Sequence, residues 1–268
     1  MQKYIIIEPC AGLANRMRAI AGANELAEKT NSKLIVIWVR NTDLYAKFSD
    51  LFMPISAKVI EFNGYGYMYK IYRHIINRVN HIYIDDNKIE NEIWQDIEKA
   101  AEKLKDKNIL IYGCLNITRS LNYSFFKPSR RIAKLLNLNI NKNVNGIHIR
   151  RTDNWVSTKY SPTSLFINKI KEDLDKNPNQ KFYLATDDKN EEKNIKEKFP
   201  NNIITHNKQS LDRTKKIGII DSMIDLCHLS MCGKIYGSYY SSFSNVAARW
   251  HGINKYILQE GKEEICFD

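Results

Sequence analysis

Residues 146–153, which read GIHIRRTD, carry the strongest chemical signal in this sequence. The alternating isoleucines predict a strand, so that His148 and Arg150 share one face and Arg151 emerges where the strand ends. Arginine presents a planar fork of N–H donors that binds two phosphate oxygens at once, and it stays charged near neutral pH. With Asp153 orienting one guanidinium, the pair predicts a clamp for a diphosphate. For either arginine alone, an ordinary ion pair at a domain edge is the alternative.

Residues 8–18, which read EPCAGLANRMR, form a second polar group after a short apolar run. We expect a strand, a turn and the start of a helix here. Gly12 permits close approach of the backbone, and the free N–H groups of the helix start attract an anion. The segment is not G-x-G-x-x-G and lacks the Lys-Ser/Thr pair of a P-loop, which argues against a dinucleotide or nucleoside-triphosphate site. Asn15 and Arg16 lie in register with the turn and favour contact with an anionic ligand.

Two further polar groups lie where strands are expected to end. Asp187 and Asp188 follow one such strand, and we expect one of them to cap the next helix and the other to serve the site. Metal binding and acid–base catalysis are open alternatives for this pair. Asp225 lies on a helix of largely apolar composition. Ser241 and Ser242 stand between a strand and a helix, where hydroxyl and backbone N–H groups donate to phosphate oxygens, and plain N-capping can coexist with that role.

The elements that must position these residues alternate between short apolar runs and segments of helical period, as in parallel βαβ units. A polar break at residues 141–143 divides them into two Rossmann-like domains, 1–140 and 141–268. Two α/β halves of this kind face each other and bind a ligand in the cleft between them, at the carboxyl ends of the strands.

The expected strands are 4–7, 34–38, 109–112, 146–149, 182–186, 203–205, 235–236 and 256–258. The expected helices are 15–30, 91–105, 128–138, 162–174, 191–199, 217–231 and 242–250. Ser161 is the expected N-cap of the helix that starts at 162. The aromatic-rich region 48–83 shows no regular pattern, and its part 65–83 is either an acceptor surface or a helical pair in the core.

Charge and composition restrict the class of protein. The 268 residues include 41 lysines and arginines against 30 aspartates and glutamates, a formal net charge of +11. This excess implies an anionic partner: nucleic acid, a phosphorylated metabolite or an acidic membrane surface. No run of about 18 apolar residues occurs, and the apolar run at the start is too short for a secretory signal. We therefore expect a cytoplasmic protein.

The cysteines indicate neither a disulfide framework nor a zinc ribbon, because their number is odd and no C-x-x-C pair occurs. We expect free, mostly buried thiols and no metal ligands. The five are Cys10, Cys114, Cys227, Cys232 and Cys266.

Residues 148–153 resemble the H-x-R-R-x-D motif of the fucosyltransferase superfamily, which joins α1,2-, α1,6- and protein O-fucosyltransferases and the rhizobial nodulation enzyme. The turn 12–15, the block 185–188, and Asp225 followed by the serines at 241–242 resemble other blocks of that superfamily in the same order. The resemblance implies a GT-B fold with an acceptor-side domain, 1–140, and a nucleotide-sugar-binding domain, 141–268. It also implies a GDP-sugar donor, an inverting displacement, and no requirement for a metal or other cofactor.

The same resemblance implies roles for individual residues. Arg150 would bind the β-phosphate and stabilise the leaving diphosphate. His148 and Asp225 would contact guanine, while Ser242 and the Gly12 turn would donate to the phosphates. The full set expected to bind the donor is Gly12, Asn15, Arg16, His148, Arg150, Arg151, Asp187, Asp188, Asp225, Ser241 and Ser242.

The sequence departs from the family after the motif. Enzymes of the α1,6 type carry a glutamate base there, whereas residues 154–159 read NWVSTK and contain no carboxylate. Glu8, Asp43 and Asp153 are the candidates for a general base, with Glu8 preferred. Arg151 and Asp153 look structural. Arg16 stands where α1,2-type enzymes commonly have glutamine, so the sugar and the acceptor stay open.

The sequence thus predicts a metal-independent glycosyltransferase that moves L-fucose from a GDP-sugar to a bacterial surface glycan or a glycolipid precursor. The basic charge fits peripheral contact with the anionic inner face of the cytoplasmic membrane. Another donor such as a GDP-heptose is the first alternative. A nucleic-acid-binding protein is the second, but the prominent arginines follow strands and have carboxylates nearby rather than forming a basic surface. We therefore expect no nucleic-acid partner.

Overall fold

The chain forms two compact units in a computed structural model that describes residues 2–89, 97–115, 117, 122–136, 138–261 and 265–267. The first unit comprises Met1–Ile132 and Asp212–Ile220, and the second comprises Ala133–Leu211 and Asp221–Asp268. The division predicted at residue 140 assigned 212–220 to the second domain. The sequence does not show that residues 212–220 belong to the first unit, because the helix α10 runs without a break over Lys216–Met231.

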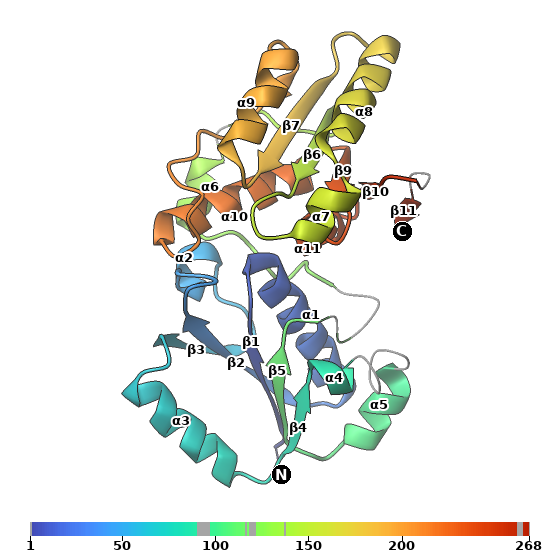
Figure 1. The fold of residues 1–268 in the computed structure, drawn as a ribbon. Helices are drawn as coiled ribbons and strands as arrows, with labels where there is room; N and C mark the ends of the chain where they lie inside the picture. Colours follow the sequence, from blue (N-terminus) through green and yellow to red (C-terminus); the bar gives the residue numbers. More distant parts are fainter. Residues whose placement is uncertain are drawn as a thin grey trace. The chain divides into compact units, whose positions relative to one another are not determined.

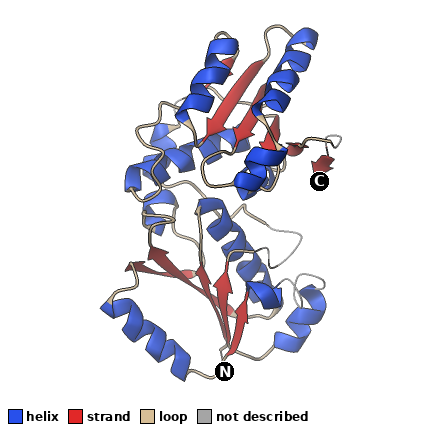
Figure 2. Cartoon of the chain, in the orientation of Figure 1, coloured by secondary structure: helices blue, strands red, loops and turns tan. Residues whose placement is uncertain are grey.

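A parallel five-stranded sheet forms the centre of the first unit, and its strands are among the red arrows of Figure 2. The strand order is β3-β2-β1-β5-β4. Its strands are β1 (Tyr4–Pro9), β2 (Lys33–Arg40), β3 (Lys58–Asn63), β4 (Ile82–Asp85) and β5 (Ile109–Gly113). In the register of the sheet, Ile7 is paired with Val36 on one side and Ile111 on the other. These three aliphatic side chains are buried, as expected for a parallel sheet covered by helices.

Helices cover this sheet (Figure 1). They are α1 (Leu13–Lys29), α2 (Phe48–Leu51), α3 (Tyr67–Arg78), α4 (Asp86–Lys88) and α5 (Ile97–Leu104), and α6 (Arg130–Leu135) follows at the boundary of the unit. The α3 helix packs Tyr69, Tyr72 and Ile76 against Ile37 and Leu110 of the sheet. The region that looked irregular in the sequence is therefore the unit β3-α3-β4. Apolar residues occur on the outer face of α3 as well.

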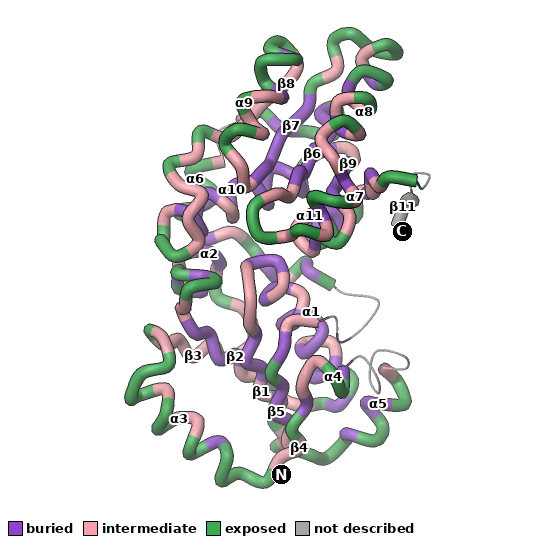
Figure 3. Tube along the Cα trace, viewed as in Figure 1, coloured by how far each residue is buried: buried purple, intermediate pink, exposed green. Residues whose placement is uncertain are grey.

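The second unit contains a six-stranded sheet in the order β11-β10-β9-β6-β7-β8, parallel except between β10 and β11. Its strands are β6 (Val144–Ile149), β7 (Lys181–Thr186), β8 (Ile203–Ile204), β9 (Lys234–Ser238), β10 (Asn254–Leu258) and β11 (Ile265–Phe267). The helices are α7 (Trp155–Tyr160), α8 (Thr163–Lys176), α9 (Lys189–Lys198), α10 and α11 (Ser242–His251). In Figure 3 the strands β6, β7 and β9 are mostly purple, because they pass through the buried core.

The eight strands expected from the sequence are all present, whereas the strands β3, β4 and β11 and the helices α2, α3, α4 and α7 were not expected. The helix expected at 91–105 is described from Ile97 as α5, and residues 90–96 lie outside the described ranges. The prediction for Ser161 is wrong: the N-cap of α8 is Pro162, which makes no side-chain capping bond. The Ser161 hydroxyl instead donates to the carbonyl oxygen of Leu258 (2.6 Å) and accepts the N–H of Tyr239 (2.8 Å).

Candidate functional site

The carboxyl ends of three neighbouring strands in the second unit bring the main polar candidates together. The strands β9, β6 and β7 are adjacent, and Ile149 is in register with Thr186. Arg150 therefore follows β6 directly beside Asp187, which follows β7, while Ser238 ends β9 on the other side. The backbone N–H of Arg150 donates to the hydroxyl of Ser238 at 3.0 Å and fixes this arrangement.

Arg150 is held between two carboxylates. Its Nη1 lies 2.8 Å from Oδ2 of Asp187, and its Nη2 pairs with Asp153. The arginine side chain is 22% exposed. An arginine oriented in this way keeps its charge and offers its remaining N–H groups to an anion. The sequence-based expectation that Asp153 orients one arginine is met by this pair.

Arg151 turns away into the unit. It donates to the carbonyl oxygen of Arg150 (2.8 Å) and to the hydroxyl of Thr163 (3.0 Å), and it pairs with Glu191 at 3.4 Å. Its side chain is only 10% exposed. The contacts tie the end of β6 to the first residue of α8 and to α9. These contacts agree with the structural role expected of Arg151. They occupy its guanidinium, so the structure does not support its predicted contact with the donor.

The two aspartates after β7 have different partners. Asp187 accepts the N–H of Arg151 at 2.8 Å and the hydroxyl of Thr152 at 2.7 Å, and it therefore shapes the loop after β6. Asp188 is the N-cap of α9, where it accepts the backbone N–H of Asn190 at 2.7 Å. One residue serves the site and the other caps the helix, so direct donor binding by Asp188 is not supported.

His148 is a buried, neutral histidine behind Arg150. It is 5% exposed, and its ring stacks on that of Phe243 with centroids 5.0 Å apart. Burial, reinforced by the nearby charge of Arg150, lowers the pKa of His148 to about 3. Its Nδ1 has no hydrogen-bond partner among the described residues. The imidazole can therefore offer one further hydrogen bond.

The start of α11 presents backbone donors. Ser241 is the N-cap residue, but its side chain makes no capping bond, so no side-chain acceptor covers the first N–H groups of the helix. Together with Ser242, these groups form a positive helix end suited to phosphate oxygens. The preceding loop is held from α7, because Asn154 donates to the carbonyl oxygen of Tyr240 (3.0 Å) and Ser157 donates to that of Tyr239 (2.6 Å).

Sequence reasoning missed these supporting residues. Asn154 also accepts the N–H of Ser157 at 3.0 Å and is the N-cap of α7. Asn154 is a residue type that often begins a helix, and this was the available signal for α7. The six residues of α7 are too few and too mixed in composition to show a helical period. Thr163 and Glu191 could not be connected to Arg151 from the sequence, because they belong to two other helices.

Asp225 is buried inside the second unit and 4% exposed. It accepts the hydroxyl of Tyr183 at 2.6 Å and pairs with Lys208 at 3.3 Å. Burial raises its pKa, and the charge of Lys208 opposes that rise. The sequence did not predict these partners of the carboxylate, because Lys208 pairs with Asp225 from a loop that the helix pattern does not show. The expected contact of Asp225 with guanine stays a prediction.

In the first unit, the turn after β1 is fixed from inside by Arg16. This arginine is 0% exposed and donates to the carbonyl oxygens of Ala11 (2.8 Å) and Val39 (2.6 Å) and to the side chain of Asn41 (2.9 Å). Burial lowers its pKa to about 10. The expectation that Arg16 contacts the donor is therefore corrected: its N–H groups hold the turn and the end of β2.

Gly12 is the N-cap of α1 in an extended conformation, and the positive φ of the turn, 59°, belongs to Ala11. A Cβ added at Gly12 would meet no atom within 4 Å, so the surface above the turn is open. Asn15 is half-buried in the first turn of α1. These two positions keep the N-terminal end of α1 accessible to an anion.

Glu8 does not have the exposure that a general base needs. It is 2% exposed, accepts the hydroxyl of Tyr69 at 2.8 Å and pairs with Arg73 at 3.2 Å, both from α3. Burial raises its pKa. The preferred base of the sequence analysis is thus covered by a helix that the sequence did not reveal. Asp153 is more exposed, at 51%, but is paired with Arg150.

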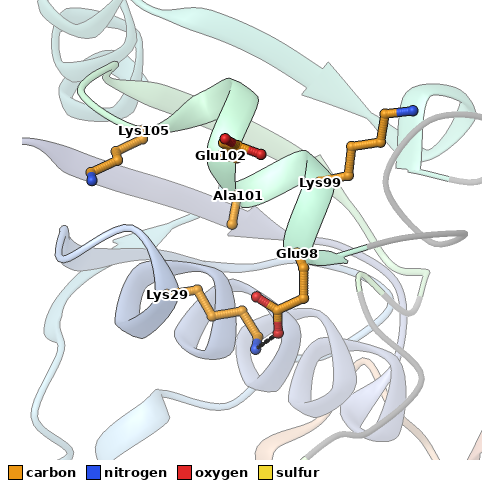
Figure 4. A pocket seen from close by; sticks show the side chains of 6 residues that line it. All are labelled: Lys29, Glu98, Lys99, Ala101, Glu102 and Lys105. Carbon is orange, nitrogen blue, oxygen red and sulfur yellow. Dashed lines mark hydrogen bonds and ion pairs between the residues drawn. The ribbon is translucent and has the colours of Figure 1, made fainter.

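Two other features of the first unit concern ligands. Within the described ranges, one group of three side chains is close enough to hold a metal ion, and it consists of Cys10, Asp86 and Cys114. A surface hollow between α1 and α5 is shown in Figure 4. It is lined by Lys29, Glu98, Lys99, Ala101, Glu102 and Lys105. Lys29 pairs with Glu98 across it, and its mixed charges resemble an ordinary solvated surface.

Comparisons with known proteins define the fold. No protein-family model and no curated protein sequence matches the chain. The structure of NodZ alpha-1,6-fucosyltransferase soaked with GDP-fucose matches with a TM-score of 0.65 and 16% identity, covering 100% of this chain and 99% of NodZ. Fucosyltransferase NodZ from Bradyrhizobium gives a TM-score of 0.64 at 15% identity with the same coverage.

Two further structures match over most of the chain. A variant of Arabidopsis thaliana FUT1 in complex with GDP gives a TM-score of 0.59 at 14% identity, covering 96% of this chain and 70% of FUT1. The apo form of POFUT1 gives 0.55 at 13% identity, covering 94% and 95%. The chain therefore has the GT-B fold of these fucosyltransferases. None of the helices in the described part is long and apolar enough to span a membrane.

Proposed function

We propose that this protein is an inverting, metal-independent glycosyltransferase that transfers L-fucose from GDP-fucose to a hydroxyl of a bacterial surface glycan or its precursor. The observation that carries the proposal is Arg150, oriented by Asp153 and Asp187 at the end of β6 in a GT-B fold. The similar NodZ structure was soaked with GDP-fucose, and the similar FUT1 structure holds GDP.

The donor's diphosphate would meet two sets of hydrogen-bond donors in the second unit. The Arg150 guanidinium binds phosphate oxygens through charge-assisted hydrogen bonds. The uncapped N–H groups at the start of α11 and the hydroxyls of Ser241 and Ser242 donate as well. Because these groups are fixed before the donor arrives, they need no reorganisation as charge develops on the leaving group. This replaces the neutralising role that a metal ion often plays.

In the proposed reaction the acceptor hydroxyl oxygen forms a bond to the anomeric carbon of fucose while the bond from that carbon to the β-phosphate oxygen breaks. The electron pair of the broken bond stays on GDP, where Arg150 stabilises it. Attack from the face opposite the leaving group inverts the anomeric configuration. The acceptor proton passes to a general base. Glu8 is buried and Asp153 is paired with Arg150, so the exposed Asp43 is the candidate that remains.

His148 is the group that we propose for recognition of guanine. Its free Nδ1 is buried, and its ring lies on Phe243. A neutral imidazole can exchange a hydrogen bond with the edge of a base without burying a charge. Asp225 supports the same region indirectly, through Tyr183 and Lys208.

A transfer assay tests this function. GDP-fucose and a GDP-heptose are supplied with a panel of glycan and glycolipid acceptors in the presence of EDTA. We expect transfer of fucose, an inverted anomeric centre in the product by NMR, and loss of transfer in Arg150→Ala. Transfer of heptose instead would replace the sugar but keep the donor class. Activity that EDTA abolishes, or an unchanged Arg150→Ala enzyme, would contradict the proposal.

The outer face of α3 supports the proposed peripheral contact with an anionic membrane. Tyr67, Met68 and Ile75 on this helix are 77%, 67% and 55% exposed. The α3 sequence contains lysine, histidine and arginine but no acidic residue. Apolar side chains next to basic ones, on a helix that lies along the surface, fit the interface of a negatively charged bilayer. A glycolipid acceptor would be met at such a surface.

A further inference from the structure

The two half-buried cysteines of the first unit lie next to each other. The register of β1 and β5 pairs Pro9 with Gly113, so Cys10 and Cys114 are the next pair beyond the ladder. The N–H of Cys10 donates to the carbonyl oxygen of Gly113 at 3.2 Å and keeps the two chains together there. The two Sγ atoms lie within 4.8 Å of each other. Residues 104 positions apart in the sequence thus form one dithiol.

A carboxylate completes the group. The Sγ atoms of Cys10 and Cys114 and a carboxylate oxygen of Asp86 all lie within 4.8 Å of one another. Asp86 is fixed in place because it accepts the N–H groups of Cys114 (2.9 Å) and Leu115 (3.0 Å). Its close approach requires a glycine at 113: a Cβ there would lie 2.1 Å from Oδ1 of Asp86.

We propose that Cys10, Asp86 and Cys114 form a binding site for a thiophilic divalent cation of the Zn²⁺ class. Two thiolates and one carboxylate are ligands that Zn²⁺ accepts, with Zn–S near 2.3 Å and Zn–O near 2.1 Å. In a tetrahedral site the two sulfurs lie about 3.8 Å apart, which the observed grouping allows. All three residues are half-buried, so a cation can enter, and a water would take the fourth position.

Binding is balanced by proton release. Two S–H bonds break, two metal–sulfur bonds form, and both protons pass to the buffer, while Asp86 binds as a carboxylate. Arg18 lies beside the group, where its Nε donates to the carbonyl oxygen of Cys114. Its positive charge offsets the net charge of −1 that three anionic ligands leave around Zn²⁺. The proposed transfer chemistry does not require this metal.

Metal titration of the full chain tests this site without any donor or acceptor. The reduced, chelator-treated protein is titrated with Co²⁺ and, by calorimetry, with Zn²⁺. We expect one equivalent of Co²⁺ to give a thiolate-to-cobalt charge-transfer band, and Zn²⁺ to bind with release of about two protons. Cys10→Ser and Cys114→Ser should weaken Zn²⁺ binding by more than about 100-fold, since even supporting residues change affinity by 10–100-fold.

Two variants separate ligand loss from misfolding. Asp86→Asn should keep the charge-transfer band but lower the affinity, because both sulfurs remain. Cys227→Ser, which removes a buried thiol of the second unit, should change nothing. Absence of the band in the reduced wild type, or Zn²⁺ binding that survives in Cys10→Ser, overturns the proposal. The proposal is also overturned if the oxidised protein contains a Cys10–Cys114 disulfide and the reduced protein binds no metal.

Discussion

At the scale of single residues, the second unit places two arginines side by side and gives them different tasks. Arg150 keeps 22% of its side chain in solvent, whereas Arg151 is 10% exposed and bound to Thr163 and Glu191. The difference arises from strand geometry, because the side chains of successive residues point to opposite sides as β6 ends. One arginine can therefore meet a ligand while its neighbour holds the loop.

Substitutions at Arg150 should separate charge from geometry. Arg150→Lys keeps the positive charge but loses the planar fork, and we expect kcat/KM for fucosyl transfer to fall about 10²–10³-fold, as for removal of one oriented donor. Arg150→Ala should fall further while the circular dichroism spectrum stays unchanged. Arg131→Ala, at an exposed position of α6, is the matched control and should retain activity. A lysine variant with normal turnover would contradict the role of the fork.

His148 predicts a pH dependence of stability. Its pKa is about 3 in the folded chain and near 6.5 when unfolded, so between these values the unfolded state binds the proton more readily. The free energy of unfolding is therefore not reduced by His148 above about pH 6.5, and it falls as the pH is lowered from 6.5 toward 3. We expect a loss of about 2 kcal/mol between pH 7 and pH 5 from this group. His148→Gln should flatten the urea-unfolding profile in that window, and an identical profile would refute the assignment.

At the scale of elements, the short helix α7 acts as a support for the loop before α11. Its N-cap Asn154 binds both Ser157 and the carbonyl oxygen of Tyr240, a residue with a positive φ of 54°. The loop is thus held in a conformation that L side chains rarely adopt. This fixes the approach to the uncapped start of α11.

Asn154→Ala should therefore cost about 1 kcal/mol of stability through the lost cap and also weaken GDP binding through the released loop. Asp188→Ala is its counterpart. It removes the cap of α9 at a similar loss of stability, but leaves the loop before α11 in place. Calorimetric affinities for GDP should distinguish the two. A greater loss of GDP affinity in Asp188→Ala would return that aspartate to the donor site.

The outer face of α3 is the second element with a testable role. We expect Met68→Ser/Ile75→Ser to reduce binding to vesicles containing phosphatidylglycerol, because both exposed apolar side chains would leave the interface. Lys70→Glu should reduce it too, by about 1 kcal/mol per charge removed and more with reversal. Leu135→Ser, an exposed leucine of α6, is the control in vesicle co-sedimentation. Equal binding to neutral phosphatidylcholine vesicles would rule out the electrostatic part.

At the scale of the whole molecule, the sequence predicted what depends on local pattern. Buried aliphatic runs identified every strand that supports the site, and the loop 150–153 was located because it follows such a run. It did not predict contacts between residues distant in sequence: Arg16 binds Val39, Glu8 accepts a hydrogen bond from Tyr69 of α3, and Asp225 pairs with Lys208. A polar residue near a strand end has the same pattern whether it faces solvent or the interior, so periodicity cannot decide.

Selective stabilisation by GDP is the prediction that concerns the molecule as a whole. A ligand that binds the folded chain at 100 times its Kd raises stability by about 2.7 kcal/mol, and for a chain of this size that corresponds to a Tm increase of roughly 5–10 °C. We expect this increase in Tm with GDP and GDP-fucose in the presence of EDTA, and much smaller increases with UDP and ADP. All four ligands contain a diphosphate, but UDP and ADP lack the guanine base.

Two variants separate the contributions of the diphosphate and the base to this increase in Tm. Arg150→Ala should lose the response to all nucleotides, because the clamp reads the diphosphate, whereas His148→Gln should reduce the preference for GDP over ADP and UDP while keeping a response to each. Differential scanning fluorimetry measures both effects. Equal shifts for the four nucleotides in the wild type would mean that the second unit does not recognise guanine, and a donor with another base would then have to be sought for the same fold.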